Sequence, residues 1–236
     1  MTPQGLVEKF GEAGGRFVTP VDELRDKLGE CRAVVFDWDG VFNSGSKGLS
    51  AQSGFSEPDS MGTNMLRYGL WRRLGQLPFT AIISGADNDS AIAYARREHL
   101  TAVYTGMRDK RQVIEHICNE HDLEPEQIAC VFDDINDLPM AAVCGPRFRV
   151  RRSASPLFAD LADRGGYCDY VSGAESNAYA VREICEVMLG LLGTYTDVVE
   201  SRIARDDRYE SYFRTRQSVV TRLYGQQGAA IIRRDD

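Results

Sequence analysis

The segment that decides the fold reads Val34-Val35-Phe36-Asp37-Trp38-Asp39-Gly40-Val41. Its apolar start, rich in β-branched residues, predicts a buried strand of a parallel sheet. The two carboxylates then lie at the carboxyl end of that strand, where open α/β sheets bind their ligands. Because residues i and i+2 of a strand point to the same side, Asp37 and Asp39 can face one cavity. Carboxylates so close repel each other unless a cation or a shared proton intervenes, so the pair is a candidate functional site.

The composition is ordinary for a globular protein and narrows the classes of partner. The 236 residues are 43% hydrophobic and 27% charged, with a formal net charge of -7. An acidic balance disfavours nucleic acid, whose phosphates attract basic surfaces. No apolar run approaches the roughly 18 residues of a membrane span, no signal peptide is evident, and the six cysteines form no Cys-x-x-Cys pair. We therefore expect a cytoplasmic protein with no nucleic-acid and no membrane partner.

Short apolar segments alternate with helix-like ones along most of the chain. The apolar segments predict strands at 34–37, 79–83, 102–104, 128–132, 148–150 and 168–171. The others predict helices at 60–71, 91–99, 110–121, 156–161 and 177–192, with a short one from Asp137. Such alternation is typical of an α/β fold, so we expect a doubly wound, Rossmann-like parallel sheet with helices on both faces.

The remaining segments divide the chain into three parts. Residues 1–30 are expected to form a loose arm and then a helix that Thr19 caps and Pro20 begins. Residues 31–193 form the core, in which the Gly/Ser-rich stretch at about 41–58 predicts a small β-hairpin flap. Residues 194–236 are highly charged and predict a helical extension that lies on the domain or on a partner subunit.

Polar residues follow three of the predicted strands and begin one helix. They are Asp37 with Asp39, Ser84 with Gly85, Asp133 with Asp134 and Asp137, and Lys110. In a doubly wound sheet these positions lie at one edge, so up to five carboxylates, a hydroxyl and an ammonium surround one crevice. Oxygen ligands of this kind suit a hard cation such as Mg²⁺, whereas no cluster of His or Cys indicates zinc.

This set of side chains fits the transfer of a phosphoryl group. A carboxylate can serve as the nucleophile and form an aspartyl phosphate. A metal ion and a lysine neutralise the charge of the group in transfer. A second acid protonates the leaving oxygen and later activates water.

The four segments, in this order and spacing, resemble the motifs of the haloacid dehalogenase-like phosphatase superfamily. The resemblance covers about residues 32–192 and rests on Phe36-Asp37-Trp38-Asp39-Gly40-Val41, Ile83-Ser84-Gly85, Lys110 and Asp133-Asp134-Ile135-Asn136-Asp137. It implies a nucleophile that is also a metal ligand (Asp37) and a general acid/base whose backbone carbonyl binds Mg²⁺ (Asp39). It further implies that the phosphate is bound by Ser84, Gly85 and Lys110, and the metal by Asp133, with Asp134 and Asp137 in or near the metal shell.

The lengths of chain between the motifs narrow the resemblance. Residues 37–84 leave room for a flap and one helix, and residues 84–110 for one helix and one strand, so we expect no large cap domain. In this the chain is similar to the minimal-cap group, and within it to the 3-deoxy-D-manno-octulosonate 8-phosphate (KDO 8-phosphate) phosphatases, which the stretch 179–183 also matches. That group implies a homotetramer whose neighbours close the site, and a small sugar phosphate or sugar-acid phosphate as substrate.

Two positions depart from that group. Ala86 stands where the group has an arginine that contacts the sugar acid, and residues 174–177 replace a Gly-rich segment that carries arginine. The motifs therefore predict the phosphatase reaction but do not predict KDO 8-phosphate itself as the substrate. One alternative source of the missing cation is the charged tail, if one of its arginines reaches a neighbour's site; the candidates are Arg202, Arg205, Arg208, Arg214, Arg216 and Arg222.

Other functions stay open beside the small-molecule phosphatase. A phosphotransferase such as a mutase is disfavoured, because those members of the superfamily usually carry a cap that excludes water. A non-catalytic binding or assembly module is also disfavoured, because such proteins usually lack the nucleophile or the metal acids, and this chain has them all. A phosphatase for nucleotides or for macromolecular phosphate remains an alternative, since a site without a cap is open unless a partner closes it.

Overall fold

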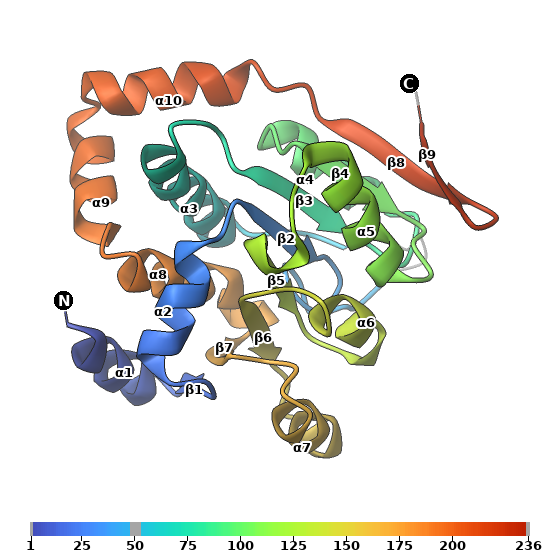
Figure 1. Ribbon diagram of the computed structural model, residues 1–236, viewed down its shortest axis with the longest axis horizontal. Helices are drawn as coiled ribbons and strands as arrows, with labels where there is room; N and C mark the ends of the chain where they lie inside the picture. The colour runs from blue at the N-terminus through green and yellow to red at the C-terminus, as the bar shows by residue number, and fades with distance from the viewer. Residues whose placement is uncertain (1, 48–52, 235–236) are drawn as a thin grey trace.

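The structure is a computed structural model that describes residues 2–47 and 53–234. Its strands form one sheet in the order β1-β7-β6-β5-β2-β3-β4-β8-β9 (Figure 1). Neighbours from β7 to β8 pair in parallel, and β1 and β9 are antiparallel at the two edges. The strands are β1 (Arg16–Phe17), β2 (Ala33–Asp37), β3 (Phe79–Ile83), β4 (Ala102–Thr105), β5 (Ile128–Phe132), β6 (Arg147–Arg151), β7 (Tyr170–Glu175), β8 (Arg222–Gln227) and β9 (Ala230–Arg233).

Helices cover both faces of the sheet, which confirms the doubly wound α/β fold. The larger apolar core holds Val34 and Phe36 of β2 and side chains of α1 (Pro3–Glu12), α2 (Val21–Gly29), α3 (Glu57–Leu74), α4 (Asp89–Arg97), α8 (Ala180–Leu191), α9 (Tyr195–Ala204) and α10 (Asp207–Gln217). The core on the other face holds Ala33 and Val35 together with α5 (Lys110–His121), α6 (Leu138–Ala141) and α7 (Pro156–Arg164). Alternate residues of β2 thus enter opposite cores, which is why the strand is apolar from Ala33 to Phe36.

Strand β2 is where the chain changes direction across the sheet. It pairs with β3 on one side and with β5 on the other. From there β4 continues the sheet one way, and β6 and β7 continue it the other way. An α/β sheet with this topology opens a crevice at the carboxyl end of its central strand. That crevice lies next to Asp37, the last residue of β2.

The N-terminal arm is more ordered than predicted. It forms α1, whose N-cap Thr2 accepts a hydrogen bond from the Gly5 N–H at 3.1 Å, and Leu6 of α1 is buried. Glycine lowers helix propensity, but burial of an apolar face outweighs it. The predicted cap of the next helix is wrong: Pro20 is the N-cap of α2, and the Thr19 hydroxyl donates at 2.6 Å to the buried carboxylate of Asp169.

The predicted β-hairpin flap has no strand pair in its described parts. Residues 41–47 and 53–56 form turns and irregular structure, and residues 48–52 lie outside the described residues. Helix α3 begins at Glu57, ahead of the expected start at residue 60. Its N-cap is Ser56, whose hydroxyl accepts a hydrogen bond from the Asp59 N–H at 3.1 Å.

The C-terminal extension is helical at first and then joins the sheet. Helices α9 and α10 agree with the prediction, and Arg216 of α10 forms a buried ion pair with Glu98 at 2.8 Å. Strand β8, which was not predicted, pairs in parallel with β4, and the rings of Tyr104 and Tyr224 stack with centroids 4.7 Å apart. Only Tyr224 and Gly225 of β8 are buried, so no apolar run indicates this strand in the sequence.

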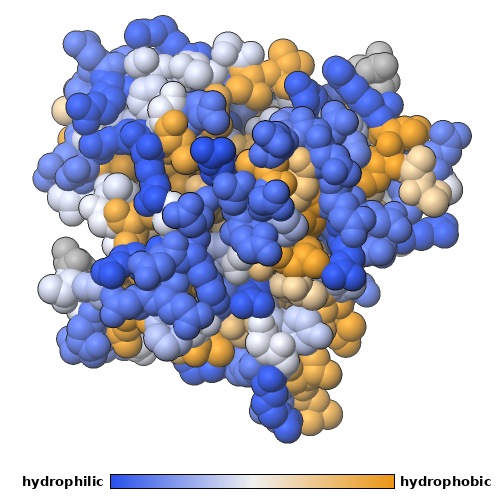
Figure 2. Space-filling view, viewed as in Figure 1, coloured by the Kyte–Doolittle hydropathy of each residue, from blue (hydrophilic) through white to orange (hydrophobic). Residues whose placement is uncertain are grey.

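Polar and charged side chains cover most of the face seen in Figure 2. Apolar side chains gather at its lower edge, where Figure 1 has α7, and this helix carries two exposed leucines, Leu157 and Leu161. No helix among the described residues is both long and apolar enough to cross a membrane.

Candidate active site

The carboxyl ends of five neighbouring strands surround one cavity of about 430 Å³. These strands are β2 to β6, in the middle of the sheet. The cavity is lined after β2 by Asp37 and Asp39, after β3 by Gly85 and Ala86, after β4 by Arg108 and Lys110, after β5 by Asp133, Asp134 and Asp137, and after β6 by Arg152. Seven of the eight residues selected from the sequence therefore line the same cavity.

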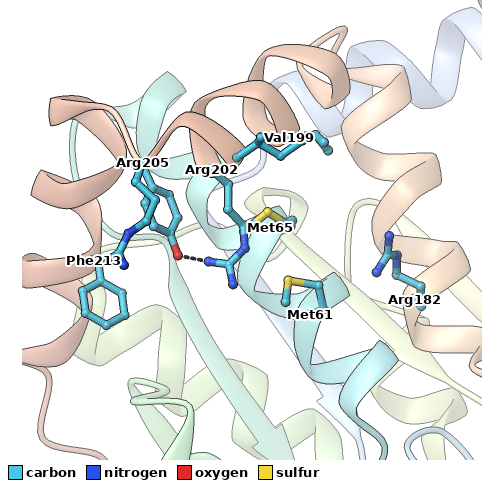
Figure 3. Close-up of a pocket in the computed structure, with 9 residues that line it drawn as sticks. Met61, Met65, Arg182, Val199, Arg202, Arg205 and Phe213 are labelled. Carbon is cyan, nitrogen blue, oxygen red and sulfur yellow. Dashed lines mark hydrogen bonds between the residues drawn. The ribbon is translucent and has the colours of Figure 1, made fainter.

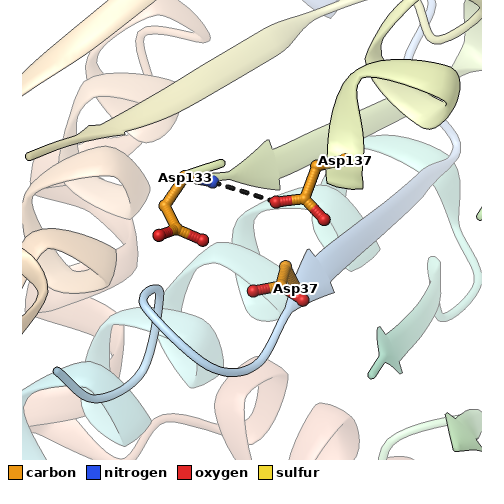
Figure 4. Close-up of side chains that lie close together, drawn as sticks. All are labelled: Asp37, Asp133 and Asp137. Carbon is orange, nitrogen blue, oxygen red and sulfur yellow. Dashed lines mark hydrogen bonds between the residues drawn. The ribbon is translucent and has the colours of Figure 1, made fainter. Parts of the chain in front are cut away.

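Three buried carboxylates form the centre of this site. Asp37, Asp133 and Asp137 each offer an oxygen atom within 4.8 Å of the other two, and all three side chains point toward one another in Figure 4. Asp37 ends β2, Asp133 directly follows β5, and Asp137 ends the short helix η2 (Ile135–Asp137). Carboxylates this close and this buried need positive charge between them.

Lys110, the first residue of α5, supplies part of that charge. Its Nζ donates to Asp37 Oδ1 and to Asp137 Oδ1. Burial on its own lowers the pKa of Lys110, but the two carboxylates outweigh it and hold that pKa above its ordinary value. Burial also raises the pKa of Asp37 well above its ordinary value, with Lys110 opposing the rise and Asp137 and Asp133 adding to it. Lys110 therefore neutralises carboxylates that would otherwise take up protons.

Asp133 has a second cation as its partner. The Arg152 guanidinium donates to Asp133 Oδ2. Burial raises the pKa of Asp133 to about 6, with Asp137 adding to the rise and Arg152 opposing it. Gly40, at φ +93°, lies against this ion pair, and a Cβ on it would overlap both side chains. The glycine after the two acids is thus required by the close approach of Asp133 as well as by its own backbone.

Asp39 lies at the rim and is held by its own set of partners. Its Oδ1 accepts from the Ser53 hydroxyl at 2.9 Å, and its Oδ2 is paired with Lys47 Nζ at 2.7 Å. Asn88 donates to Oδ2 at 3.4 Å and to Ser53 at 3.2 Å. The side chain of Asp39 is 23% exposed, whereas Asp37 is buried.

Ser84 is close to the cavity but does not line it. The residue is 1% exposed, and its hydroxyl accepts from the Ala86 N–H at 3.3 Å. Its own N–H donates to the Tyr104 carbonyl at 2.8 Å, which ties the end of β3 to β4. The cavity wall at this point consists of Gly85 and Ala86.

Asp134 and Asp137, to which the resemblance gave similar roles, have different contacts in the structure. Asp134 is the N-cap of η2, and its carboxylate accepts from the Ile135 N–H at 2.8 Å. Asp137 lies in the carboxylate cluster, and its Oδ2 accepts from the N–H groups of Asp133 and Asp134 at 3.3 and 3.2 Å. Asp137 therefore fixes the backbone of the acidic loop and holds Lys110 at the same time.

Several side chains of the site were missed from the sequence. Arg152 is the residue after β6, so the reasoning that selected polar residues at strand ends could have found it. Arg108 lies two residues before Lys110, in the loop between β4 and α5. Lys47, Ser53 and Asn88 had no such signal, because their contacts with Asp39 depend on how the flap and the loop after β3 fold back.

The donor set fits a divalent cation. The five carboxylates and three cationic side chains that line the cavity give it a formal charge of -2. Hard cations such as Mg²⁺ take oxygen ligands, usually one or two carboxylates beside water and phosphate. The clustered oxygens of Asp37, Asp133 and Asp137 are of this kind.

A larger cavity, of about 570 Å³, lies elsewhere, between α3, α8, α9 and α10 (Figure 3). Arg182 pairs with Glu186 at 2.7 Å, Arg205 pairs with Glu210 at 2.8 Å, and Arg202 donates to the Tyr209 hydroxyl. None of the described residues that line this cavity carries a carboxylate, and its apolar wall includes Met61, Met65 and Phe213. It therefore lacks the groups that phosphoryl transfer needs, and the smaller cavity is the candidate active site.

Comparison with known proteins leads to the same group of enzymes. No family model matches the chain. The 3-deoxy-D-manno-octulosonate 8-phosphate phosphatase KdsC of Yersinia pestis is 26% identical over 172 residues, which are 71% of this chain and 84% of the relative.

The solved structures that resemble this fold include a probable YrbI family phosphatase from Pseudomonas syringae. It has a TM-score of 0.64 and 25% identity, and the match covers 77% of this chain and 97% of that one. The 3-deoxy-D-manno-octulosonate 8-phosphate phosphatase of Moraxella catarrhalis, solved with magnesium, phosphate and KDO, has a TM-score of 0.64 at 20% identity and covers 76% and 98%. The resemblance drawn from the sequence motifs is confirmed by these matches.

Proposed function

We propose that this chain, whose relatives and structural neighbours are haloacid dehalogenase-like phosphatases of the KDO 8-phosphate type, is an Mg²⁺-dependent phosphomonoester hydrolase. The observation that carries the proposal is the buried cluster of Asp37, Asp133 and Asp137 around Lys110, at the carboxyl ends of adjacent parallel strands. In this cavity a buried lysine lies between carboxylates, and the charged side chains of the lining have a formal charge of -2 in total. Such an arrangement binds a cation and a phosphate together.

The metal ligands in this proposal are the carboxylates of Asp37 and Asp133 and the backbone carbonyl of Asp39, with Asp137 beside them. When bound, Mg²⁺ would neutralise the charge on the phosphoryl oxygens and favour the ionised form of the carboxylates. Lys110 adds a fixed positive charge at the same place, because Asp37 and Asp137 keep it protonated. Gly85 and Ala86 provide backbone along the wall where the phosphate would lie.

In the first step Asp37 attacks the phosphorus atom of the ester. Its Oδ1 accepts from Lys110, while Oδ2 accepts no hydrogen bond from the described residues and is the free nucleophile. A bond forms between this oxygen and phosphorus, and the bond from phosphorus to the ester oxygen breaks. Asp39 donates a proton to the departing oxygen, which leaves as an alcohol.

In the second step water hydrolyses the aspartyl phosphate. Asp39, now ionised, takes a proton from the water as its oxygen bonds to phosphorus. The bond from phosphorus to Asp37 breaks, so that inorganic phosphate and the original carboxylate result. The Ser53, Lys47 and Asn88 contacts orient Asp39 for both proton transfers.

The substrate class follows from the size and the polarity of the cavity. A volume of about 430 Å³, lined mainly by charged groups, suits a small polar phosphate ester rather than an apolar one. We infer a sugar phosphate or a sugar-acid phosphate, by similarity to the KDO 8-phosphate phosphatases. A homotetramer stays a prediction on the same ground, and a cytoplasmic location stays a prediction from the sequence.

Release of inorganic phosphate tests this proposal. The purified chain is assayed against sugar phosphates, sugar-acid phosphates, nucleotides and an aryl phosphate, with Mg²⁺ and with EDTA. We expect turnover of sugar or sugar-acid phosphates that EDTA abolishes and that added Mg²⁺ restores. Turnover that is indifferent to EDTA would contradict the metal assignment, and no turnover of any ester would contradict the hydrolase.

A further inference from the structure

One cation at the cavity has no role in the phosphoryl chemistry. Arg108 lines the cavity from the loop between β4 and α5, and its side chain is exposed. Among the described residues its guanidinium has no hydrogen bond and no ion pair. Arg152, by contrast, is paired with Asp133, and Lys110 with Asp37 and Asp137. Of the three cations among the described residues that line the cavity, Arg108 is therefore the one whose charge is free for a ligand.

The loop that carries Arg108 is held by the C-terminal hairpin of the same chain. The Arg108 N–H donates to the Gln226 side-chain carbonyl at 2.9 Å, and Gln226 belongs to β8. Strand β8 itself pairs with β4, with Thr105 opposite Gly225. The register of this pairing brings Gln226 beside the end of β4, next to the start of the loop. The backbone of Arg108 thus has a fixed position although its side chain is exposed.

The same hairpin also holds the loop after β3, which lines the cavity with Gly85 and Ala86. Arg234 Nη1 donates to Asp87 Oδ1 at 2.8 Å, and the Thr105 hydroxyl donates to the same oxygen at 3.1 Å. The Arg234 N–H donates to the Leu223 carbonyl at 2.8 Å, which keeps this residue across β8. Both loops that line the cavity near Ala86 are therefore attached to residues 223–234.

We propose that Arg108, positioned by Gln226, binds an anionic group on the part of the substrate that leaves as the alcohol. The chemical class is a phosphate ester with a second negative charge, such as a carboxylate, and the C-terminal hairpin is the element that sets this specificity. A guanidinium donates two parallel hydrogen bonds to a carboxylate, and such charged pairs are stronger than neutral ones. This inference rests on the proposed function, because it names the substrate class of the same site.

Matched pairs of esters test the preference for an acid. Each pair has one skeleton with a carboxylate or a CH₂OH group: phosphoglycolate and ethylene glycol phosphate, 3-phosphoglycerate and glycerol 3-phosphate, 6-phosphogluconate and sorbitol 6-phosphate. We expect kcat/KM of the native chain to favour the acid by about tenfold or more in at least one pair. No preference in any pair would overturn the proposal.

Variants then locate the preference in the structure. Arg108→Ala is expected to remove most of it through a higher KM for the acid, and Arg108→Lys to restore part of it. Gln226→Met, which removes the acceptor for the Arg108 N–H, is expected to lower the preference in the same sense. Arg111→Ala and Gln227→Met are the matched controls, since both residues are exposed and neither lines the cavity. Equal effects on acid and neutral esters in Arg108→Ala would contradict the assignment.

Binding without turnover separates this inference from the proposed function. Calorimetric titration of the Asp37→Asn variant with 6-phosphogluconate and sorbitol 6-phosphate, in Mg²⁺, measures the preference for the acid without turnover. Tighter binding of the acid that Arg108→Ala abolishes supports the inference even if the chain hydrolyses neither ester. Equal binding of both esters, in a chain that hydrolyses other phosphates, would overturn the inference and leave the hydrolase standing.

Discussion

Gly40 illustrates how much of this site depends on the space around single atoms. Its φ of +93° is strained for any residue with a side chain, and a Cβ would overlap Asp133 and Arg152. Gly40→Ala is therefore expected to displace Asp133, with a loss of phosphatase activity of at least about tenfold and a loss of stability of about 1–3 kcal/mol. Activity in Mg²⁺ and thermal unfolding of the variant measure the two effects.

Gly75→Ala is the control for backbone strain alone. Gly75 also has a positive φ, +72°, at the end of α3, but no atom lies within 4 Å of its would-be Cβ. This variant should lose about 1 kcal/mol of stability and keep its activity. Equal activity losses in both variants would show that strain, and not the contact with Asp133, causes the effect at Gly40.

The carboxylates also predict how Mg²⁺ binding depends on pH. The pKa of Asp133 is raised to about 6, so in the folded protein this side chain is mostly protonated below that pH and ionised above it. Protons then compete with Mg²⁺ on the acid side, and the raised pKa of Asp37 acts in the same direction. We expect the gain in melting temperature from Mg²⁺ to be larger at about pH 7.5 than at about pH 5.5. A gain that is equal at both values would count against Asp133 as a ligand.

Among the helices and strands, the buried strands could be predicted from the sequence, and the strands at the edges of the sheet could not. Strand β2 is buried on both faces, so every residue before Asp37 is apolar and the run is easy to recognise in the sequence. Strand β8 is buried at only two positions, and its pairing with β4 decides its structure. Helix α1 was also missed because packing decides its structure. Its glycines weaken the helical pattern in the sequence, and the burial of Leu6 in the larger core stabilises the helix.

Strand β8 should contribute measurably to stability through its aromatic contact. Tyr224 is 6% exposed, its ring stacks on Tyr104, and His116 meets it edge-on at 5.0 Å. Tyr224→Ala is expected to cost about 3 kcal/mol of unfolding free energy, because it opens a cavity beside β4. Chemical denaturation measures this, with Val220→Ala, at a residue 83% exposed, as the control that should stay within about 0.5 kcal/mol. A Tyr224 variant as stable as this control would mean that β8 is not docked as described.

Over the whole molecule, the sequence predicted which side chains meet but not how their charges are balanced. Strand order brings Asp37, Lys110 and Asp133 to one edge of the sheet, and polar residues at strand ends are enough to infer this. Arg152 on Asp133 and Lys47 on Asp39 depend on the paths of loops, which carry no periodic signal. Arg108 is a similar case, because it reaches the cavity from the loop between β4 and α5, which carries no periodic signal either.

The number of chains in the assembly is also a prediction. By similarity to the KDO 8-phosphate phosphatases we expect a tetramer, about four times the 26.3 kDa of one chain. Exposed leucines on α7 are one apolar surface that such an assembly could cover. Light scattering after size-exclusion chromatography measures the mass, and a monomer at micromolar concentration would contradict this expectation.

In the proposed reaction Asp37 attacks phosphorus, and the rate of p-nitrophenyl phosphate hydrolysis by Asp37→Asn in Mg²⁺ tests this step. An amide is not a nucleophile for this reaction, so kcat should fall by at least about a thousandfold while the fold is retained. Asp160→Asn, at a carboxylate 64% exposed on α7, should hydrolyse the ester as the native chain does. Brief exposure of the native chain to substrate, followed by acid quench and mass spectrometry, should give a phosphate on the peptide that contains Asp37. Near-native hydrolysis by Asp37→Asn, or a phosphate on a different residue, would show that Asp37 is not the nucleophile.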